Sequence, residues 1–244
     1  MKIAILACKT LKHEIEKACK DNNIDYPIYW VESGLHNYPE KLHKTVQEEL
    51  DKLQDFDRVI MTFGLCGNAL LGIKSNNLEL IMPKVDDCIS LMLGSVDERR
   101  KYGGKKGMYF LTKGWIEGER NLWVEYQYTI EKYGEETGKE VFDMMLNHYK
   151  TLGVIDTKCY DLSEIMPLCR EISETLNLKL KILEYPIDYI EKLLTGPWDE
   201  KKFVVIKKED LVWIIVMIRN VSLQLGAQRR LILLFVQLSI LEMK

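Results

Sequence analysis

The chain lacks the long hydrophobic runs, the basic excess and the closely spaced cysteine pairs that mark several large classes of protein. No apolar run reaches the ~18 residues expected of a membrane-spanning helix. The 34 Lys and Arg residues are outnumbered by 37 Asp and Glu residues, a net charge of −3. No basic field therefore favours nucleic acid or an anionic membrane surface as a partner. The six cysteines include no Cys-x-x-Cys pair, the usual short-range metal motif.

A signal peptide is also missing from the start, "MKIAILACKTLKHEIEKA", which has no basic region before its apolar run and no small-residue cleavage site. We therefore expect a cytoplasmic protein. In that reducing compartment, scattered cysteines are more often metal ligands, reactive thiols or buried apolar residues than disulfides. A hydrophobic content of 47% and a charged content of 29% are typical of a folded globular chain.

Strand and helix patterns alternate along most of the sequence. Short apolar runs predict strands at 2–8, 25–34, 56–64, 78–85, 107–115, 153–158, 178–186 and 202–208. Amphipathic spacing predicts helices at 11–20, 38–53, 120–134, 135–153, 162–177 and 187–196. The predicted fold class is α/β, with a mostly parallel sheet and helices on both faces, and two Rossmann-like lobes fit the same pattern.

We expect residues 1–208 to form this α/β domain. Its lobes would be 1–118 and 151–208, joined by a helical pair at 119–150. Residues 209–244 form an atypical apolar tail, whose two apolar runs are interrupted by arginines and are each too short to span a bilayer.

Polar and thiol-bearing residues follow each of the first five predicted strands. In an open parallel sheet, ligands bind outside the carboxyl ends of the strands. The residues expected at that edge are Cys8; Glu32, Ser33 and His36; Gly64, Cys66, Gly67 and Asn68; Asp86, Asp87 and Cys88; and Thr112, Lys113, Gly114 and Trp115. Because all five strands would share one sheet, the sequence predicts a single site there.

Cys8, Cys66 and Cys88 are the candidate metal ligands. Three thiolates can complete a tetrahedral zinc site with one further ligand, or can hold three irons of a [4Fe–4S] cluster. The alternative is packing, because cysteine is among the most often buried residue types. We expect packing for the remaining cysteines, which are Cys19, Cys159 and Cys169.

The other candidate residues surround these cysteines. His36, Asp86 and Asp87 could act as acid–base groups or as a fourth ligand, but the aspartates could equally cap a helix that contains Cys88 in its first turn. Gly64, Gly67 and Asn68 would let the backbone approach a cofactor, and a helix is expected just after them. Lys113 could hold an anionic group and Trp115 could stack on a flat ligand, or Trp115 could simply cover the sheet edge.

Six strings in this order resemble the DUF1638 family of uncharacterised proteins: "ILAC", "LHNYPEKL", "FGLCGNALLGI", "MPKVDDCISLMLGS", "YFLTKGWIE" and "LNHYKTLGVIDT". The resemblance covers residues 1 to about 206. It implies an occurrence in anaerobic archaea and bacteria, often beside corrinoid-dependent methyltransferase systems. The recurrent cysteines of the family match Cys8, Cys66 and Cys88, and members usually stop soon after the "FVVI" strand. A frameshift is therefore one hypothesis for residues 209–244.

Three functions remain open at this point. The first is a metal-binding or metal-cofactor-binding protein, with zinc, an iron–sulfur cluster or a corrinoid as the cofactor, which the resemblance connects to methyl-group metabolism. The second is a non-catalytic accessory that binds a corrinoid or another tetrapyrrole, or delivers a metal, for a corrinoid protein or methyltransferase. The third is a regulatory module that binds a small molecule and has structural cysteines.

Overall fold

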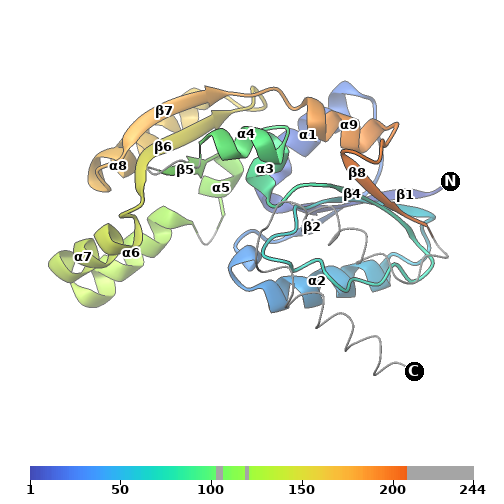
Figure 1. The fold of residues 1–244 in the computed structure, drawn as a ribbon, viewed down its shortest axis with the longest axis horizontal. Helices are drawn as coiled ribbons and strands as arrows, with labels where there is room; N and C mark the ends of the chain where they lie inside the picture. The colour runs from blue at the N-terminus through green and yellow to red at the C-terminus, as the bar shows by residue number, and fades with distance from the viewer. Residues whose placement is uncertain (103–106, 119–120, 208–244) are drawn as a thin grey trace. The chain divides into compact units, whose positions relative to one another are not determined.

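The computed structural model describes residues 1–102, 107–118 and 121–207. They belong to one compact unit that contains two β-sheets with their helices (Figure 1). The apolar tail predicted at 209–244 lies outside the described residues. None of the helices in the described ranges combines the length and the apolar character needed to cross a membrane.

The first sheet has five strands in the order β2-β1-β3-β4-β8. Their bounds are β1 (Ile3–Cys8), β2 (Ile28–Val31), β3 (Arg58–Thr62), β4 (Glu79–Pro83) and β8 (Phe203–Ile206). The first four are mutually parallel, and β8 pairs with β4 in the antiparallel direction. The central strands β1 and β3 are largely apolar, and all but the first residue of each is buried because helices cover both faces of the sheet.

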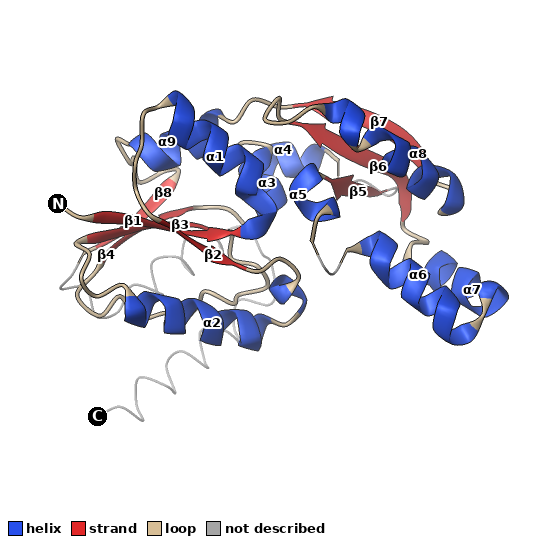
Figure 2. Ribbon diagram, turned by 180° about the vertical axis from the view of Figure 1, so that it is seen from behind, coloured by secondary structure: helices blue, strands red, loops and turns tan. Residues whose placement is uncertain are grey.

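Helix α2 (Pro39–Lys52) covers one face of this sheet, and α1 (Lys12–Asp21) and α9 (Asp188–Thr195) cover the other (Figure 2). Helix α2 begins at a proline, whose missing N–H costs nothing in the first turn. Its buried residues Leu42, Val46 and Leu50 recur every fourth position, as expected for a helix with one apolar stripe.

The second sheet consists of three parallel strands in the order β5-β6-β7. Their bounds are β5 (Gly107–Leu111), β6 (Tyr149–Asp156) and β7 (Lys179–Glu184). A separate apolar core packs this sheet against α6 (Leu122–Tyr133), α7 (Glu135–Met145) and α8 (Met166–Thr175). Cys169 is fully buried in that core, as a packing residue should be.

Short helices occupy several connections between the strands. They are η1 (Lys9–Leu11), η2 (Leu35–Asn37), α3 (Cys88–Met92), α4 (Val96–Lys101), α5 (Lys113–Ile116) and η3 (Leu162–Glu164). Helix α3 follows β4, and α5 follows β5, so each begins just past the carboxyl end of a strand.

The predicted α/β fold class is confirmed, but the expectation that five consecutive strands share one sheet is wrong. Strand β5 pairs with β6 in the second sheet. The physical reason lies at the edge of β4, where β8 returns and pairs, so that edge is filled. Strand β6 also begins at Tyr149, four residues before the predicted position, because α7 ends at Met145. The predicted lobe limits of 1–118 and 151–208 stay a prediction.

Candidate functional site

The three candidate cysteines meet in one buried cluster at the carboxyl edge of the first sheet. Cys8 is the last residue of β1, Cys66 lies in the turn after β3, and Cys88 is the first residue of α3. Their exposed fractions are 9%, 8% and 7%. The Cys88 thiol lies close enough to the Cys8 thiol and to the Cys66 thiol for each of these neighbours to shift its pKa. Three distant segments of the chain therefore bring their sulfur atoms together around Cys88.

The surroundings favour the neutral thiol at Cys8 and at Cys88. Contact with Cys88, followed by burial, raises the pKa of Cys8 well above its ordinary value. Contact with Cys66 is the largest cause that raises the pKa of Cys88, and burial adds to it. The Thr10 hydroxyl lies 3.3 Å from the Cys8 sulfur and acts in the opposite direction. With no cation present, the electrostatics oppose a reactive thiolate, whereas a bound cation would reverse that preference.

The turn after β3 lies directly against the segment after β4. The Leu65 N–H donates to the Val85 carbonyl at 3.0 Å, and the Cys66 N–H donates to the Asp86 carbonyl at 2.9 Å. Gly64 makes this approach possible, because a Cβ there would lie 2.5 Å from the backbone of Asp87. The crossing of these two segments places Cys66 beside Cys88.

The helix expected just after Cys66 does not form. Cys66, Gly67 and Asn68 all have positive φ values, of 45°, 69° and 70°. A run of left-handed residues cannot continue into a right-handed helix, and the chain instead makes a series of turns. A positive φ at a non-glycine residue is strained, and here it occurs at the residue that supplies a sulfur atom.

The two aspartates have different surroundings. Asp87 caps α3, since its Oδ1 accepts from the Ser90 N–H at 2.7 Å and from the Ser90 hydroxyl at 2.8 Å. Its other oxygen lies 3.7 Å from Arg99 Nε. Burial, and then the Asp87 charge, raises the pKa of Asp86. The capping alternative is thus confirmed for Asp87, and an acid–base role for either aspartate stays a prediction.

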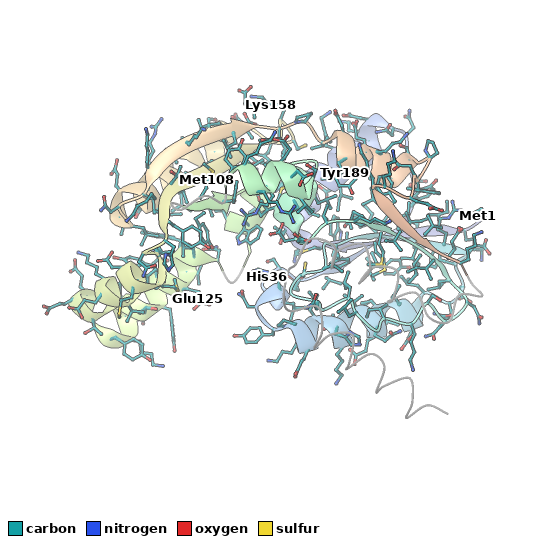
Figure 3. The ribbon with its side chains drawn as sticks, in the orientation of Figure 1. Met1, His36, Met108, Glu125, Lys158 and Tyr189 are labelled. Atoms are coloured by element: carbon teal, nitrogen blue, oxygen red, sulfur yellow. The ribbon has the colours of Figure 1, made fainter. Side chains whose placement is uncertain are left out.

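His36 and Trp115 pack against each other beside this cluster. Figure 3 labels His36, which lies in η2 between β2 and α2. Its ring meets Trp115 edge to face, with centroids 5.3 Å apart. Burial lowers the pKa of His36, and the nearby Asp87 partly opposes the shift. A neutral imidazole is the form that binds metals or accepts a proton.

Helix α5 follows a strand of the second sheet, but its Gly114 and Trp115 contact segments that follow strands of the first. Gly114, in α5, lies so close to Thr10 that a Cβ would stand 2.2 Å from its carbonyl oxygen. The Lys113 ammonium pairs with Glu164 Oε2 at 2.5 Å, and Glu164 lies in η3, after a strand of the second sheet. The structure thus brings Trp115 toward the site through helix packing, and leaves the anion-binding role of Lys113 a prediction.

The cysteines supply ligand atoms that suit a metal ion, but their side chains are not arranged around a common point. In the part of the chain that the structure describes, no three His, Cys, Asp or Glu side chains form a group arranged to hold a metal ion. The sulfur contacts run from Cys8 to Cys88 to Cys66, with Cys88 in the middle. The donor set suits a soft metal, and the side chains would have to rearrange to surround one.

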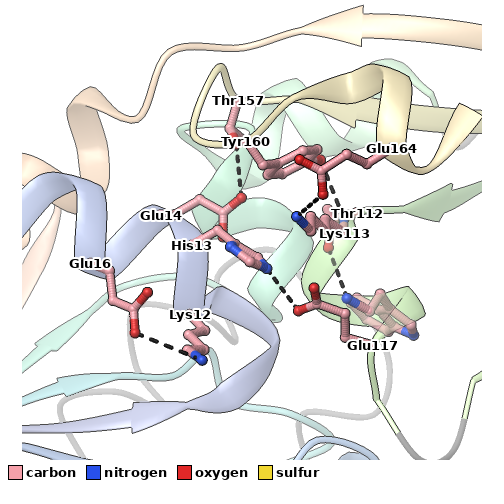
Figure 4. Close-up of polar contacts among 11 residues, drawn as sticks. Lys12, His13, Glu14, Glu16, Thr112, Lys113, Glu117, Thr157, Tyr160 and Glu164 are labelled. Carbon is pink, nitrogen blue, oxygen red and sulfur yellow. Dashed lines mark hydrogen bonds and ion pairs between the residues drawn. The ribbon is translucent and has the colours of Figure 1, made fainter.

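One buried acid, Glu14, was not among the candidate residues predicted from the sequence. Glu14, on α1, is 0% exposed, and its Oε1 accepts from the Thr157 hydroxyl at 2.8 Å (Figure 4). Its Oε2 is buried and has no hydrogen-bond partner among the described residues. The signal was present in the sequence, because Glu14 falls on the apolar face of α1 with Leu11, Ile15 and Ala18.

Glu14 belongs to a polar seam that connects α1 to elements of the second sheet. His13 Nε2 lies 2.7 Å from Glu117 Oε2, just past α5, and the His13 ring also contacts Tyr160 (Figure 4). Burial raises the pKa of Glu14, with a smaller contribution from Glu117. The Thr157 hydrogen bond and His13 act in the opposite direction. The net effect is a pKa of Glu14 above its ordinary value.

A Gly64→Ala variant should test the crossing that joins Cys66 to Cys88. The added methyl would overlap backbone atoms of Asp87, which cannot move aside as a flexible side chain can. We expect the free energy of unfolding in urea to fall by about 1–3 kcal/mol. Gly107→Ala is the matched control, since its nearest contact would be an ordinary 3.4 Å. Equal stability of the two variants would contradict this account of the crossing.

Glu14→Gln should change how stability depends on pH. Because the folded pKa of Glu14 lies above its ordinary value of 4.5, folding binds a proton, and stability is lost as pH rises from that value through the folded pKa. The glutamine side chain of the variant does not titrate, so its stability should not fall in this way. Relative to wild type, the variant should therefore gain stability as pH rises from 4.5 through the folded pKa of Glu14. Urea unfolding at a series of pH values measures the difference. Exposed Glu16, on the same helix, supplies the control Glu16→Gln, and identical pH profiles for wild type and Glu14→Gln would refute the assignment.

Of the comparisons with known proteins, the one with protein families gives a match. No curated protein matches the chain significantly. Residues 30–194, more than half of the chain, match the profile of a family described as "Protein of unknown function (DUF1638)". The matched span contains Cys66, Cys88 and His36, whereas Cys8 precedes it. The chain therefore belongs to the DUF1638 family.

Proposed function

We propose that this protein binds a soft metal ion or a metal cofactor through Cys8, Cys66 and Cys88. The observation that carries the proposal is the meeting of three thiols, from three different strand ends, in one buried cluster. Cysteines that only filled the core would have no reason to gather at the carboxyl edge of a parallel sheet, where ligands bind. Cys19 and Cys169 show the ordinary alternative, since each is buried on a helix away from the strand ends.

The donor set suits zinc or an iron–sulfur cluster. Three sulfur ligands leave one position of a tetrahedral site for another group or for a substrate. His36 lies near Asp87, the residue before Cys88, and its lowered pKa keeps the ring neutral near pH 7. His36 is therefore our candidate for the fourth ligand or for a group that holds the ligands in position.

The electrostatics support a cation more than a nucleophilic thiol. A cysteine nucleophile needs a lowered pKa, usually from a nearby positive charge. Here the pKa of Cys8 and that of Cys88 are raised, and Asp87 adds a negative charge beside Cys88. A metal ion would supply the missing positive charge and favour the thiolates.

The connection to corrinoid-dependent methyl-group metabolism is a further part of the proposal and rests on the family resemblance. When bound, such a cofactor or metal would supply group-transfer chemistry. Trp115, packed on His36, would then be our candidate for a flat surface against which the cofactor stacks. A corrinoid protein or a methyltransferase would be the corresponding partner.

A second candidate function is a regulatory module with structural cysteines, and one observation favours it. The Cys88 thiol already interacts with both other thiols, and no described group of three ligands surrounds a common point. Buried free thiols behave as small apolar side chains and can be stable in a core without a metal. This alternative predicts a metal-free protein whose fold tolerates loss of the thiols.

Elemental analysis of protein purified without oxygen tests the metal site. We expect a stoichiometric metal in wild type, and at least a tenfold lower metal content in Cys88→Ser, because Cys88 contacts both other sulfurs. Visible absorption would show an iron–sulfur cluster, and a colourless protein with zinc would show a zinc site. The matched control is Cys19→Ser, which removes an equally buried thiol outside the cluster.

Two results would overturn the metal assignment. One is a metal-free wild-type protein, and the other is a triple serine variant at positions 8, 66 and 88 with unchanged metal content. Adding cobalamin and following its absorption spectrum separates a corrinoid-binding role from the regulatory alternative. A spectral shift in wild type would support the corrinoid role, and an unchanged spectrum would remove it from the proposal.

A further inference from the structure

The α6–α7 hairpin exposes an unusual share of large apolar side chains. Among the described residues, nine large hydrophobic side chains are exposed, and six of them lie on this hairpin. The six are Val124, Tyr128, Tyr133, Val141, Met144 and Met145. Single exposed apolar residues are normal on a protein surface, but a concentration on one element is typical of an interaction site.

The hairpin itself is well packed, so this exposure does not come from a loose structure. The Tyr126 ring meets Phe142 edge to face at 5.1 Å, which joins α6 to α7. Gly138 lies against Ile130 so closely that a Cβ would stand 2.6 Å from its Cδ1. The buried faces of both helices are thus occupied, and the exposed apolar groups lie outside that contact.

Helix α7 carries the most coherent part of this surface. Val141, Met144 and Met145 are spaced i, i+3 and i+4, so they share one side of the helix. Met144 is 68% exposed and Met145 is 51% exposed. Methionine side chains are flexible and polarizable, and they are common on surfaces that bind the apolar face of another helix.

The hairpin is also strongly acidic. Residues 122–145 contain six acidic and two basic side chains, a net charge of −4, which exceeds the −3 of the whole chain. Both lysines have partners within the hairpin: Lys132 lies over the Tyr128 and Tyr133 rings, and Lys139 pairs with Glu135 at 2.6 Å. An apolar surface surrounded by negative charge is complementary to an apolar surface with a basic rim.

We propose that the α6–α7 hairpin is a docking surface for a partner protein that presents an amphipathic helix with Lys and Arg residues along its apolar face. Two alternatives are disfavoured by the same charge. A second copy of the chain would bring two acidic hairpins together, and an anionic lipid surface would be repelled. The hairpin lies at the end of the second sheet that is remote from the first (Figures 1 and 2), so the surface is separate from the thiol cluster.

Two defined peptides test this proposal on the full chain. One is a fluorescent amphipathic helix of Leu and Lys, and the other has the same length with Glu in place of Lys. Fluorescence anisotropy should show binding of the basic peptide, at least tenfold weaker binding of the acidic one, and weaker binding of the basic peptide at high salt. The variant Met144→Ser/Met145→Ser keeps all charges and should weaken binding of the basic peptide at least tenfold.

The controls make each outcome decisive. Ile182→Ser removes an exposed apolar side chain from β7, outside the hairpin, and should bind the basic peptide as wild type does. Cys88→Ser should also bind the basic peptide as wild type does. Failure of the docking proposal would therefore be independent of the metal proposal. Equal binding of both peptides, binding of neither, or full binding by the methionine variant would overturn the proposal. Sedimentation that shows a dimer lost in the methionine variant, or binding to phosphatidylglycerol vesicles, would assign the surface to a second copy or to lipid instead.

Discussion

The thiol cluster depends on one close contact, the crossing of the segments that follow β3 and β4. At Gly64 the two backbones approach to a distance that no side chain would allow. The hydrogen bond from the Cys66 N–H to the Asp86 carbonyl then fixes the register between them. Because Asp87 also caps α3, the same contact sets the start of the helix whose first residue is Cys88. Two sulfur atoms are thereby positioned by backbone contacts, which are more rigid than side-chain contacts.

A second set of contacts joins the two sheets around this crossing. Gly114 packs on Thr10, directly after the strand that ends at Cys8. One helical turn further along, Glu14 is buried and accepts a hydrogen bond from Thr157, at the carboxyl end of β6. A buried carboxyl with one oxygen unpartnered lowers the stability of the fold. Proteins usually keep such a group only where it has a structural or functional role. The seam therefore connects the carboxyl edges of both sheets.

The elements were largely predictable from sequence, whereas their assignment to sheets was not. Apolar strands such as residues 3–8 and capped helices such as α3 are encoded locally, by periodicity and by Asp87. The pairing of β5 depends on β8, which returns about 90 residues later to fill the edge of β4, and no local pattern contains that information. The turn at Cys66 was missed for a related reason, since positive φ at a cysteine is imposed by contacts with the next segment. Glu14 was detectable, because a charge on an apolar helix face needs a buried partner.

The thiol cluster and the neighbouring carboxyl groups supply the electrostatic argument for the proposed cation. Taken alone, Cys88 at the start of a helix would have a favoured thiolate, because the N–H groups there are positive. The pKa of Cys88 is raised instead, because contact with Cys66 and burial favour the protonated thiol. Asp86 shows the same behaviour, with a pKa raised by burial and by Asp87. The cluster, where raised pKa values favour the protonated forms of Cys8, Cys88 and Asp86, is short of positive charge. Ligand binding that releases those protons would recover the cost, as metal binding to cysteine ligands does.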